Sequence, residues 1–199
     1  VARERPDVVL IQAGRPLAMA KAFQASGLPT VVYLRDVEFH ELGGSPAALE
    51  GVSYIANSRF VAERFRAAFG PEPQVIRPLF RAERYVTPRE PKEVTFINPH
   101  PVKGVDLAFA IAALCPEIPF RFVEGWPMNA AEQAALEKRV AAHPNIRLQP
   151  RTQDMRRVYA TTRLLLAPSQ WEEAWGRVAT EAQFSGIPVL GSDRGGLPE

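Results

Sequence analysis

The sequence predicts an α/β protein with two doubly wound parallel sheets, and three observations lead to this fold class. Short runs rich in Val, Ile and Leu alternate with longer stretches of helical periodicity along the 199 residues, which is the element order of parallel sheets. The runs are apolar almost without interruption, as strands are when helices cover both faces of their sheet. One polar stretch at 80–92 breaks this rhythm and divides the chain into two parts.

The individual elements follow from the same pattern. The predicted strands lie at 8–12, 30–34, 53–56, 74–76, 94–97, 120–123, 146–148, 163–167 and 188–191. The predicted helices lie between them, at 16–25, 59–69, 105–114, 130–142, 153–160 and 176–184. Ser58 suits the N-cap of the second helix, because its hydroxyl can accept a hydrogen bond from a free amide of the first turn. Gly70 and Pro71 end that helix.

The stretch 80–92 predicts an interdomain linker, since it contains two prolines and many charges without a sustained apolar period. The chain then divides into an N-terminal domain at 1–79 and a C-terminal domain at 93–199. The chain begins without Met and stops directly after a Gly-Gly turn, so we expect both domains to be incomplete. Ligands of open parallel sheets bind at the carboxyl ends of strands where the strand order reverses, and we expect the functional site there.

Composition excludes several classes of protein. The chain carries 24 basic and 22 acidic residues, a net charge of +2, which is too balanced for a protein that mainly binds nucleic acid. Cys115 is the single cysteine, and the three histidines lie far apart, so we expect no disulfide and no metal site. No secretory signal and no bilayer-long apolar run occur, which makes a cytoplasmic location the default expectation. The glycine patterns of dinucleotide dehydrogenases and P-loop enzymes are missing.

The segment 168–182 holds the strongest functional signal. It follows a predicted strand and leads into a predicted helix that starts at Gly176. A glycine lets a ligand approach the backbone closely, and free amides at a helix start favour an anion such as a diphosphate. Glu173 and Glu181, with seven residues between them, flank this point and can each accept hydrogen bonds from sugar hydroxyls. The structural alternative makes Glu173 part of a solvated turn and Glu181 a charge on the helix surface.

This segment resembles the donor-binding signature of retaining glycosyltransferases of family 4 (group 1). Their fold, called GT-B, consists of two Rossmann-like domains. The resemblance implies that Glu173 contacts the donor sugar and that Glu181 contacts the ribose of the nucleotide. It also implies that Gly176 and Arg177 lie beside the diphosphate, within a donor-binding segment that includes Trp175 and Val178. The matching residues are Pro168-Ser169, Glu173-Ala174-Trp175-Gly176 and Glu181-Ala182.

A second match, at 98–104, follows the first predicted strand of the C-terminal domain. It resembles the strand-end motif of the family, in which an arginine and a Lys-Gly pair bind the donor diphosphate. Lys103 and Gly104 match that pair, and the ammonium group would offset charge that develops on the departing diphosphate. Asn98 stands near the place of the arginine, so one cation is missing from the motif. Arg151 and Arg194 are the candidate substitutes.

The N-terminal half resembles the family more weakly. Residues 5–9 and 28–32 resemble two family strands that lead to the cleft. In many relatives the second of these strands ends in a His-Asp pair, and here Arg35 takes the place of the histidine as a candidate catalytic residue, followed by Asp36. The earliest strand of the family, its glycine-rich acceptor loop and its last helix have no counterpart in this sequence.

The resemblance implies transfer of a hexose from a nucleotide diphosphate sugar to an acceptor hydroxyl, with retained anomeric configuration and without a metal or cofactor. The partners would be the nucleotide sugar and a saccharide or lipid-linked acceptor. A lipid-linked acceptor would bring the protein to the inner membrane surface. Two alternatives stay open. One is another enzyme of this fold, a nucleotide-sugar epimerase or a phosphorylase-like enzyme. The other is a non-catalytic nucleotide-sugar-binding module, which the departures at Asn98 and Arg35 favour.

Overall fold

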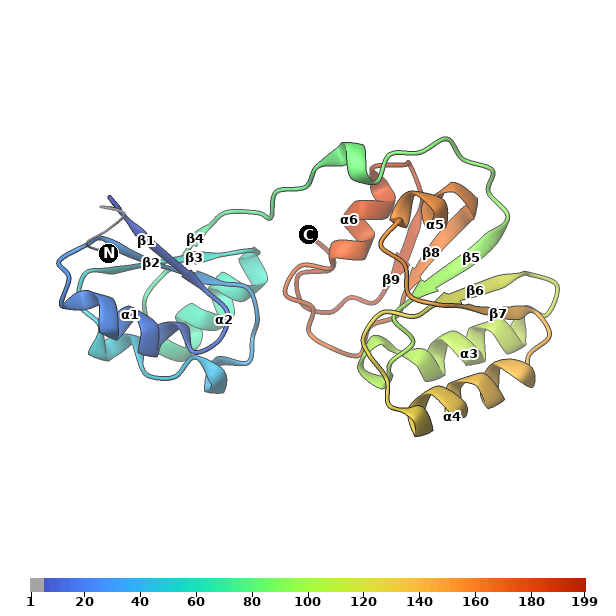
Figure 1. Cartoon of the computed structure of the whole chain (residues 1–199), viewed down its shortest axis with the longest axis horizontal. Helices are drawn as coiled ribbons and strands as arrows, with labels where there is room; N and C mark the ends of the chain where they lie inside the picture. The colour runs from blue at the N-terminus through green and yellow to red at the C-terminus, as the bar shows by residue number, and fades with distance from the viewer. Residues whose placement is uncertain (1–5) are drawn as a thin grey trace. The chain divides into compact units, whose positions relative to one another are not determined.

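The computed structural model describes residues 6–199 and contains two parallel sheets (Figure 1). Arg5, which begins one of the segments that resemble a family strand, lies outside the described residues. Packing divides the chain into two compact units. The first unit extends to Leu79 and includes Glu172–Trp175 and Glu199, whereas the second consists of Phe80–Trp171 and Gly176–Pro198. The stretch 80–92, predicted to be a linker, therefore packs as part of the second unit.

The first unit contains a four-stranded parallel sheet whose strands follow one another in chain order. Its strands are β1 (Val9–Gln12), β2 (Thr30–Leu34), β3 (Val52–Ala56) and β4 (Gln74–Val75). Its α-helices are α1 (Pro16–Gln24) and α2 (Arg59–Phe69). Both helices contribute to one core cluster against the sheet, with Leu17 from α1, Phe65 from α2 and Val32 from β2 fully covered. On the opposite face of the sheet, Leu10 is 59% exposed.

Local signals explain where α2 begins and ends. The Ser58 hydroxyl accepts a hydrogen bond from the Val61 amide at 3.0 Å, which confirms the predicted cap. Gly70 ends the helix with φ 96°, a backbone conformation that glycine adopts without steric cost. Between these ends, Phe65 and Phe69 lie one turn apart, and both rings pack against Phe39.

The second unit contains a five-stranded parallel sheet in the order β7-β6-β5-β8-β9. Its strands are β5 (Glu93–Ile97), β6 (Phe120–Val123), β7 (Ile146–Gln149), β8 (Thr162–Ala167) and β9 (Val189–Gly191). Its α-helices are α3 (Val105–Leu114), α4 (Ala130–Ala141), α5 (Met155–Thr161) and α6 (Arg177–Gln183). The strand order reverses between β5 and β8, so the crevice for a ligand is expected at their carboxyl ends.

Helices cover both faces of this second sheet. On one face α3 and α4 bury Phe109 and Leu136 against Phe96 and Phe122. On the other face α5 and α6 form a separate cluster around Tyr159. Figure 1 shows the two helix pairs on opposite sides of the sheet. The remaining helices are short 3-10 turns at η1 (Phe39–Glu41), η2 (Pro46–Ala48), η3 (Ala82–Arg84) and η4 (Pro101–Lys103).

A polar network lies under α5, at the amino ends of the strands. Arg121 on β6 is 3% exposed and donates hydrogen bonds to Thr95 and Thr162 at 3.1 and 3.0 Å. Glu93 lies 3.4 Å from the Arg121 guanidinium and receives two hydrogen bonds from Arg147, each of 2.7 Å. Buried charges are tolerated when they are paired and hydrogen-bonded, as these are. The network ties β5, β6, β7 and β8 together at the end of the sheet opposite the expected crevice.

Every strand and helix that the sequence predicts is present, and the ends differ by at most two residues. Within residues 6–199, no helix has both the length and the apolar character that crossing a bilayer would require.

Candidate functional site

Two sequence motifs meet at the point where the strand order of the second unit reverses. The loop after β5 holds Lys103, and the loop after β8 holds the Pro-Ser pair. The amides of Gln170 and Trp171 both donate hydrogen bonds of 2.9 Å to the carbonyl of Val102. The Ser169 hydroxyl reaches the same carbonyl at 3.3 Å. The structure thus brings together two segments that lie 67 residues apart in the sequence.

The backbone conformation and the close contact at Gly104 explain why the residue after Lys103 is a glycine. It forms the N-cap of α3 with φ 82°, a left-handed conformation. A β-carbon at this position would lie 2.0 Å from the carbonyl oxygen of Pro168, which is far inside van der Waals contact. The absence of a side chain therefore lets the loop after β5 lie directly against the loop after β8.

Asn98 has a structural task at the place where the family pattern has an arginine. It adopts φ 64°, a left-handed conformation in which Asn is far more common than Arg. Its Oδ1 accepts a hydrogen bond of 3.0 Å from the Trp126 amide, in the loop after β6. A β-carbon on Gly125 would lie 2.7 Å from the Asn98 Cβ, so this contact is also tight. Asn98 therefore fastens the loop after β6 to the end of β5.

Lys103 lies beside the aromatic ring of Trp126. Its ammonium group is 5.0 Å from the centroid of the Trp126 ring, within the range of a cation–π interaction. His100 packs edge-on against the same ring, with a centroid separation of 5.1 Å. The His100 Nδ1 accepts a hydrogen bond from the Val102 amide, which fixes the ring beside the lysine loop. Sequence reasoning did not single out Trp126, which became recognisable only through this clustering.

Gly176 begins α6 with φ 81°, and a β-carbon there would lie 2.4 Å from Leu197. This contact packs the Gly-Gly turn of the sequence against the start of the helix. Val178, on the first turn of α6, packs against the core cluster around Tyr159. Arg177 turns its guanidinium over the Phe80 ring at 4.8 Å.

Glu181 is buried, so the alternative that makes it a charge on the helix surface is wrong. It is 8% exposed, and its Oε2 accepts a hydrogen bond of 3.0 Å from the Tyr159 hydroxyl. Its Oε1 lies 3.5 Å from the Arg177 guanidinium, one helical turn earlier. Burial raises the pKa of Glu181, and the hydrogen bonds and charge supplied by Tyr159, Arg177 and Tyr85 offset only part of that rise. The pKa of Tyr159 is raised as well, first by burial and then by the Glu181 charge.

The other predicted residues are distributed over both units. Glu173 and Trp175 belong to the segment that packs with the first unit, where Glu173 is half-buried and Trp175 has the Arg77 guanidinium 5.9 Å from its ring centroid. Their arrangement with Glu181 and Lys103 around one donor stays a prediction. Arg35 follows β2, is exposed, and donates a hydrogen bond of 3.2 Å to Gln12 at the end of β1.

The two candidate substitutes for the missing cation differ in position. Arg151 follows β7 and is exposed. Arg194 lies beside the loop after β8, because its Nη1 donates a hydrogen bond of 3.4 Å to the carbonyl oxygen of Gln170, in the loop that contacts Val102. Of the two, Arg194 is therefore the one that the structure brings to the motif junction.

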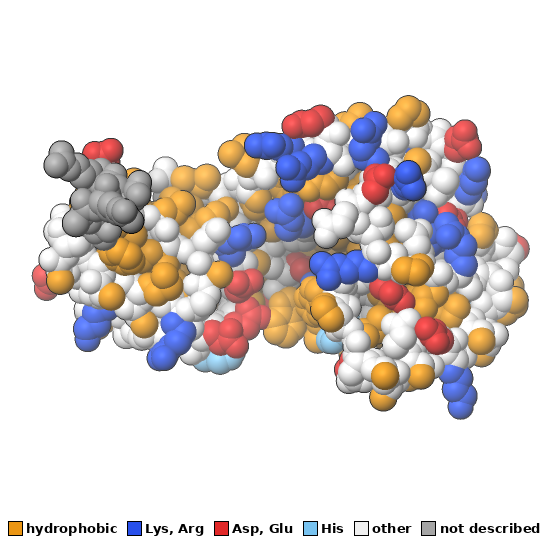
Figure 2. All heavy atoms as spheres, in the orientation of Figure 1, with side chains coloured by type: hydrophobic (Ala, Val, Ile, Leu, Met, Phe, Trp, Pro, Cys, Tyr) orange, Lys and Arg blue, Asp and Glu red, His pale blue; other side chains and the backbone are white. Residues whose placement is uncertain are grey.

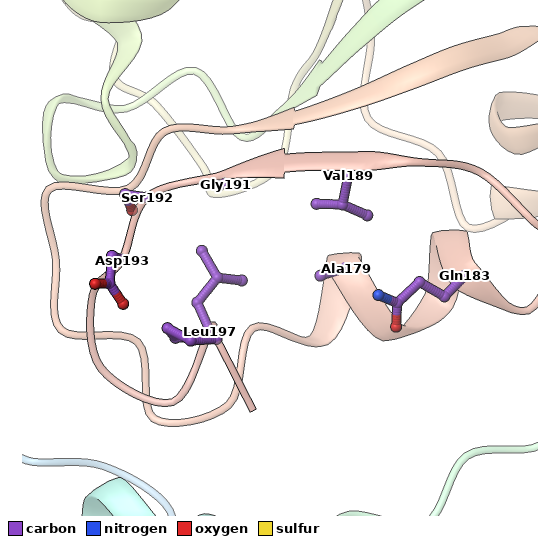
Figure 3. Close-up of a pocket in the computed structure, with 8 residues that line it drawn as sticks. Ala179, Gln183, Val189, Gly191, Ser192, Asp193 and Leu197 are labelled. Carbon is purple, nitrogen blue, oxygen red and sulfur yellow. The ribbon is translucent and has the colours of Figure 1, made fainter.

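A pocket of about 280 Å³ lies between α6 and β9 with the loop that follows β9 (Figure 3). Gln183, Ser192 and Asp193 supply its polar groups, and Val189 and Leu197 supply apolar walls. Sequence reasoning did not identify Gln183, Ser192 or Asp193, because none of them belongs to a recognisable pattern.

Known proteins resemble this chain in sequence and in fold. The model of the family described as "Glycosyl transferases group 1" matches residues 92–199, which is more than half of the chain. A D-inositol 3-phosphate glycosyltransferase of Mycobacterium sp. (strain KMS) is 29% identical over the whole chain, which spans 49% of that protein. The chain therefore covers about half the length of such curated relatives.

Solved structures show the same fold. HepE of Anabaena, in complex with UDP-glucose, matches 96% of this chain with a TM-score of 0.76 and 20% identity, and the match spans 60% of that protein. A glycosyltransferase from Rickettsia africae matches 98% of this chain with a TM-score of 0.78 and 15% identity, and the match spans 60% of that protein. These neighbours have the GT-B fold of two Rossmann-like domains, of which this chain contains a part. With its motif junction and its family match, the chain belongs to the group 1 glycosyl transferases.

Proposed function

We propose that this chain is part of a retaining glycosyltransferase that moves a hexose from a nucleotide diphosphate sugar to an acceptor hydroxyl. The observation that supports this most is the junction at Val102, where the loop with Lys103 is hydrogen-bonded to the loop that leads toward Glu173 and Glu181. A junction at the reversal of strand order is where open parallel sheets bind nucleotides.

In this proposal Lys103 stabilises the departing diphosphate. When the bond between the sugar carbon and the diphosphate oxygen breaks, the electron pair stays with the oxygen and its negative charge grows. A preorganised ammonium group stabilises that charge more in the transition state than in the bound donor, which is what accelerates a reaction. Arg194 is the second cation that we assign to this place, because it contacts Gln170 at the same junction.

The two glutamates hold the two sugar rings of the donor. Glu181 would accept hydrogen bonds from the ribose hydroxyls, and Glu173 from the hydroxyls of the transferred hexose. We assign Gly176, Trp175 and Val178 to the wall beside the diphosphate, and Arg35 to the acceptor side. Since protein cations would balance the leaving-group charge, we propose that transfer needs no metal and no cofactor.

The chemistry of the relatives suggests which partners to test first. One solved neighbour binds UDP-glucose, and one curated relative is a D-inositol 3-phosphate glycosyltransferase. We therefore propose a UDP sugar as the donor and a saccharide or lipid-linked alcohol as the acceptor. On the face seen in Figure 2, Lys and Arg side chains are more frequent on the second unit than on the first, which suits an anionic ligand. We propose a cytoplasmic protein that works at the inner membrane face when its acceptor is a lipid.

One observation favours a second candidate function, that of a nucleotide-sugar-binding module that does not catalyse transfer. The side chain of Asn98 is bound to the Trp126 amide, so the strand-end motif has one cation fewer than the family pattern. Loss of leaving-group stabilisation would impair transfer more than binding.

Calorimetric titration with UDP, GDP and ADP sugars tests the proposal, followed by assay of sugar release with and without an acceptor. We expect one nucleotide sugar to bind and Lys103→Met to weaken it about tenfold or more. Lys92→Met is the matched control, because Lys92 pairs with Glu90 before the amino end of β5 while Lys103 follows its carboxyl end. Absence of binding by every sugar in the panel would refute both candidates, and binding without release would support the second.

A further inference from the structure

The hydroxyl of Tyr159 is hydrogen-bonded to a carboxylate of the proposed donor site. Tyr159 lies on α5 and is fully buried in the cluster with Leu165 and Ile187. Its hydroxyl donates a hydrogen bond of 3.0 Å to the Oε2 of Glu181, on α6. A buried tyrosine usually finds a partner for its hydroxyl, but hydrogen bonds to charged groups are about twice as strong as those between neutral groups. The contact therefore restrains the carboxylate as well as satisfying the phenol.

Two further groups face Glu181, and both are themselves held in place. Arg177, on the same helix, lies 3.5 Å from Oε1 and rests on the Phe80 ring. Tyr85, from the segment before β5, offsets part of the rise in the pKa of Glu181 and stacks on Phe184 at an interplanar angle of 11°. Tyr159 from α5 and Arg177 from α6 thus face the two oxygens of one carboxylate.

We propose that Tyr159 is a positioning residue for nucleotide binding, which holds the Glu181 carboxylate so that it presents acceptor positions to the two hydroxyls of a ribose. This inference rests on the proposed function of Glu181. An ionised carboxylate offers about four acceptor positions, and Tyr159 occupies one of them at Oε2. Arg177 faces the other oxygen, Oε1, at 3.5 Å. The acceptor positions that neither Tyr159 nor Arg177 faces are those left for the two hydroxyls of a diol.

A purely structural tyrosine would not affect ligand discrimination, whereas a positioning residue would. Removing the Tyr159 hydroxyl takes a charge-assisted hydrogen bond from a carboxylate that is 8% exposed. The charged form is then less stable, so the pKa of Glu181, already raised by burial, rises further. A protonated or rotated carboxyl group has fewer acceptor positions for the ribose, and a 2′-deoxy nucleotide lacks one of the hydroxyls that use them.

Titration of UDP and 2′-deoxy-UDP against the chain and its Tyr159→Phe variant tests the proposal. We expect the variant to bind UDP about tenfold more weakly at pH 7, with little change for 2′-deoxy-UDP, so that discrimination between them shrinks. The pH at which UDP affinity falls on acidification should move upward in the variant. Tyr54→Phe is the control, since Tyr54 is also buried but its hydroxyl contacts no hydrogen-bond partner in the described part of the chain.

Unchanged discrimination and an unchanged pH midpoint in Tyr159→Phe would overturn the inference and leave the proposed function intact. If the wild-type chain binds neither UDP nor the other nucleotide diphosphates, the proposed function fails, and the inference fails with it. Should Tyr159→Phe not fold, incorporation of 3-fluorotyrosine at this position keeps the ring and hydroxyl but makes a stronger donor. The pH midpoint of UDP binding should then move downward, and a midpoint that stays in place would overturn the inference.

Discussion

Gly104 lies so close to Pro168 that a β-carbon on the glycine would come within 2.0 Å of the proline carbonyl oxygen. This contact holds the loop after β5 directly against the loop after β8, at the point where the strand order of the second unit reverses.

The Gly104→Ala variant should therefore lose both stability and donor binding. We expect a fall of about 2–4 kcal/mol in the free energy of unfolding, from the φ of 82° and from the clash with backbone that cannot move aside. Urea unfolding and calorimetry measure the two effects. Gly51→Ala is the matched control, with φ 67° but no atom within 4 Å of the added carbon. Equal losses in the two variants would show that the contact with Pro168 has no effect.

Glu93→Gln should destabilise the second unit without changing the junction of the loops after β5 and β8. Removal of the charge leaves Arg121, which is 3% exposed, without its ion-pair partner, and unpairing a buried charge costs about 3–5 kcal/mol. Glu90→Gln, whose pair with Lys92 is exposed, should change stability by less than about 1 kcal/mol. The free energy of unfolding in urea at pH 7 distinguishes these outcomes.

The same carboxyl group predicts a pH dependence. Burial alone would raise the pKa of Glu93, but the hydrogen bond from Arg147 and the charges of Arg121 and Arg147 outweigh it, so the pKa is lowered. Below the ordinary value of 4.5 the unfolded chain then binds more protons than the folded chain. Stability should therefore fall as the pH drops below 4.5, and it should fall less steeply in Glu93→Gln. Parallel stability curves for the two proteins would contradict this.

Glu181→Gln should separate stability from function. Because burial raises the pKa of Glu181, its charge disfavours the folded state at neutral pH, and an amide can still accept the Tyr159 hydroxyl. Arg177 loses a partner, but its side chain is 48% exposed and can be hydrated. We expect unchanged or slightly higher thermal stability at pH 7, together with donor binding about tenfold weaker. A large loss of stability in a thermal melt would mean that the carboxylate serves the fold.

Glu173→Gln should sharply reduce transfer and leave the melting temperature unchanged. A neutral amide gives weaker hydrogen bonds to sugar hydroxyls than a carboxylate, and Glu173 is only half-buried, so the fold should tolerate the change. The neighbouring Glu172→Gln serves as the control for a charge change in the same turn. Wild-type rates of sugar release in Glu173→Gln would end the assignment of this residue.

The sequence predicts the fold well because its signals are local. The uninterrupted apolar runs of the strands, the serine before α2 and the glycine after it each act within a few residues. The contacts of Val102 bring the loops after β5 and β8 together. That the motifs around Lys103 and Gly176 share one site stays a prediction.

The features that sequence reasoning missed depend on contacts between distant residues. Nothing near Glu181 indicates that Tyr159, 22 residues earlier, binds its carboxylate. Arg121 is visible in the sequence as a charge within an apolar strand, but the sequence does not indicate that Glu93 is its ion-pair partner. From the sequence, Asn98 marks only the place where the family motif has an arginine. In the structure its φ of 64° and its hydrogen bond from the Trp126 amide show a residue suited to a turn.

The most direct test of the account is a crystal structure of the chain soaked with the nucleotide sugar that binds best in the calorimetric panel. We expect the diphosphate within hydrogen-bond reach of the Lys103 ammonium, and the ribose hydroxyls on the Glu181 carboxylate that Tyr159 holds. A nucleotide bound away from Lys103, with no ribose hydroxyl within hydrogen-bond reach of the Glu181 carboxylate, would contradict the account.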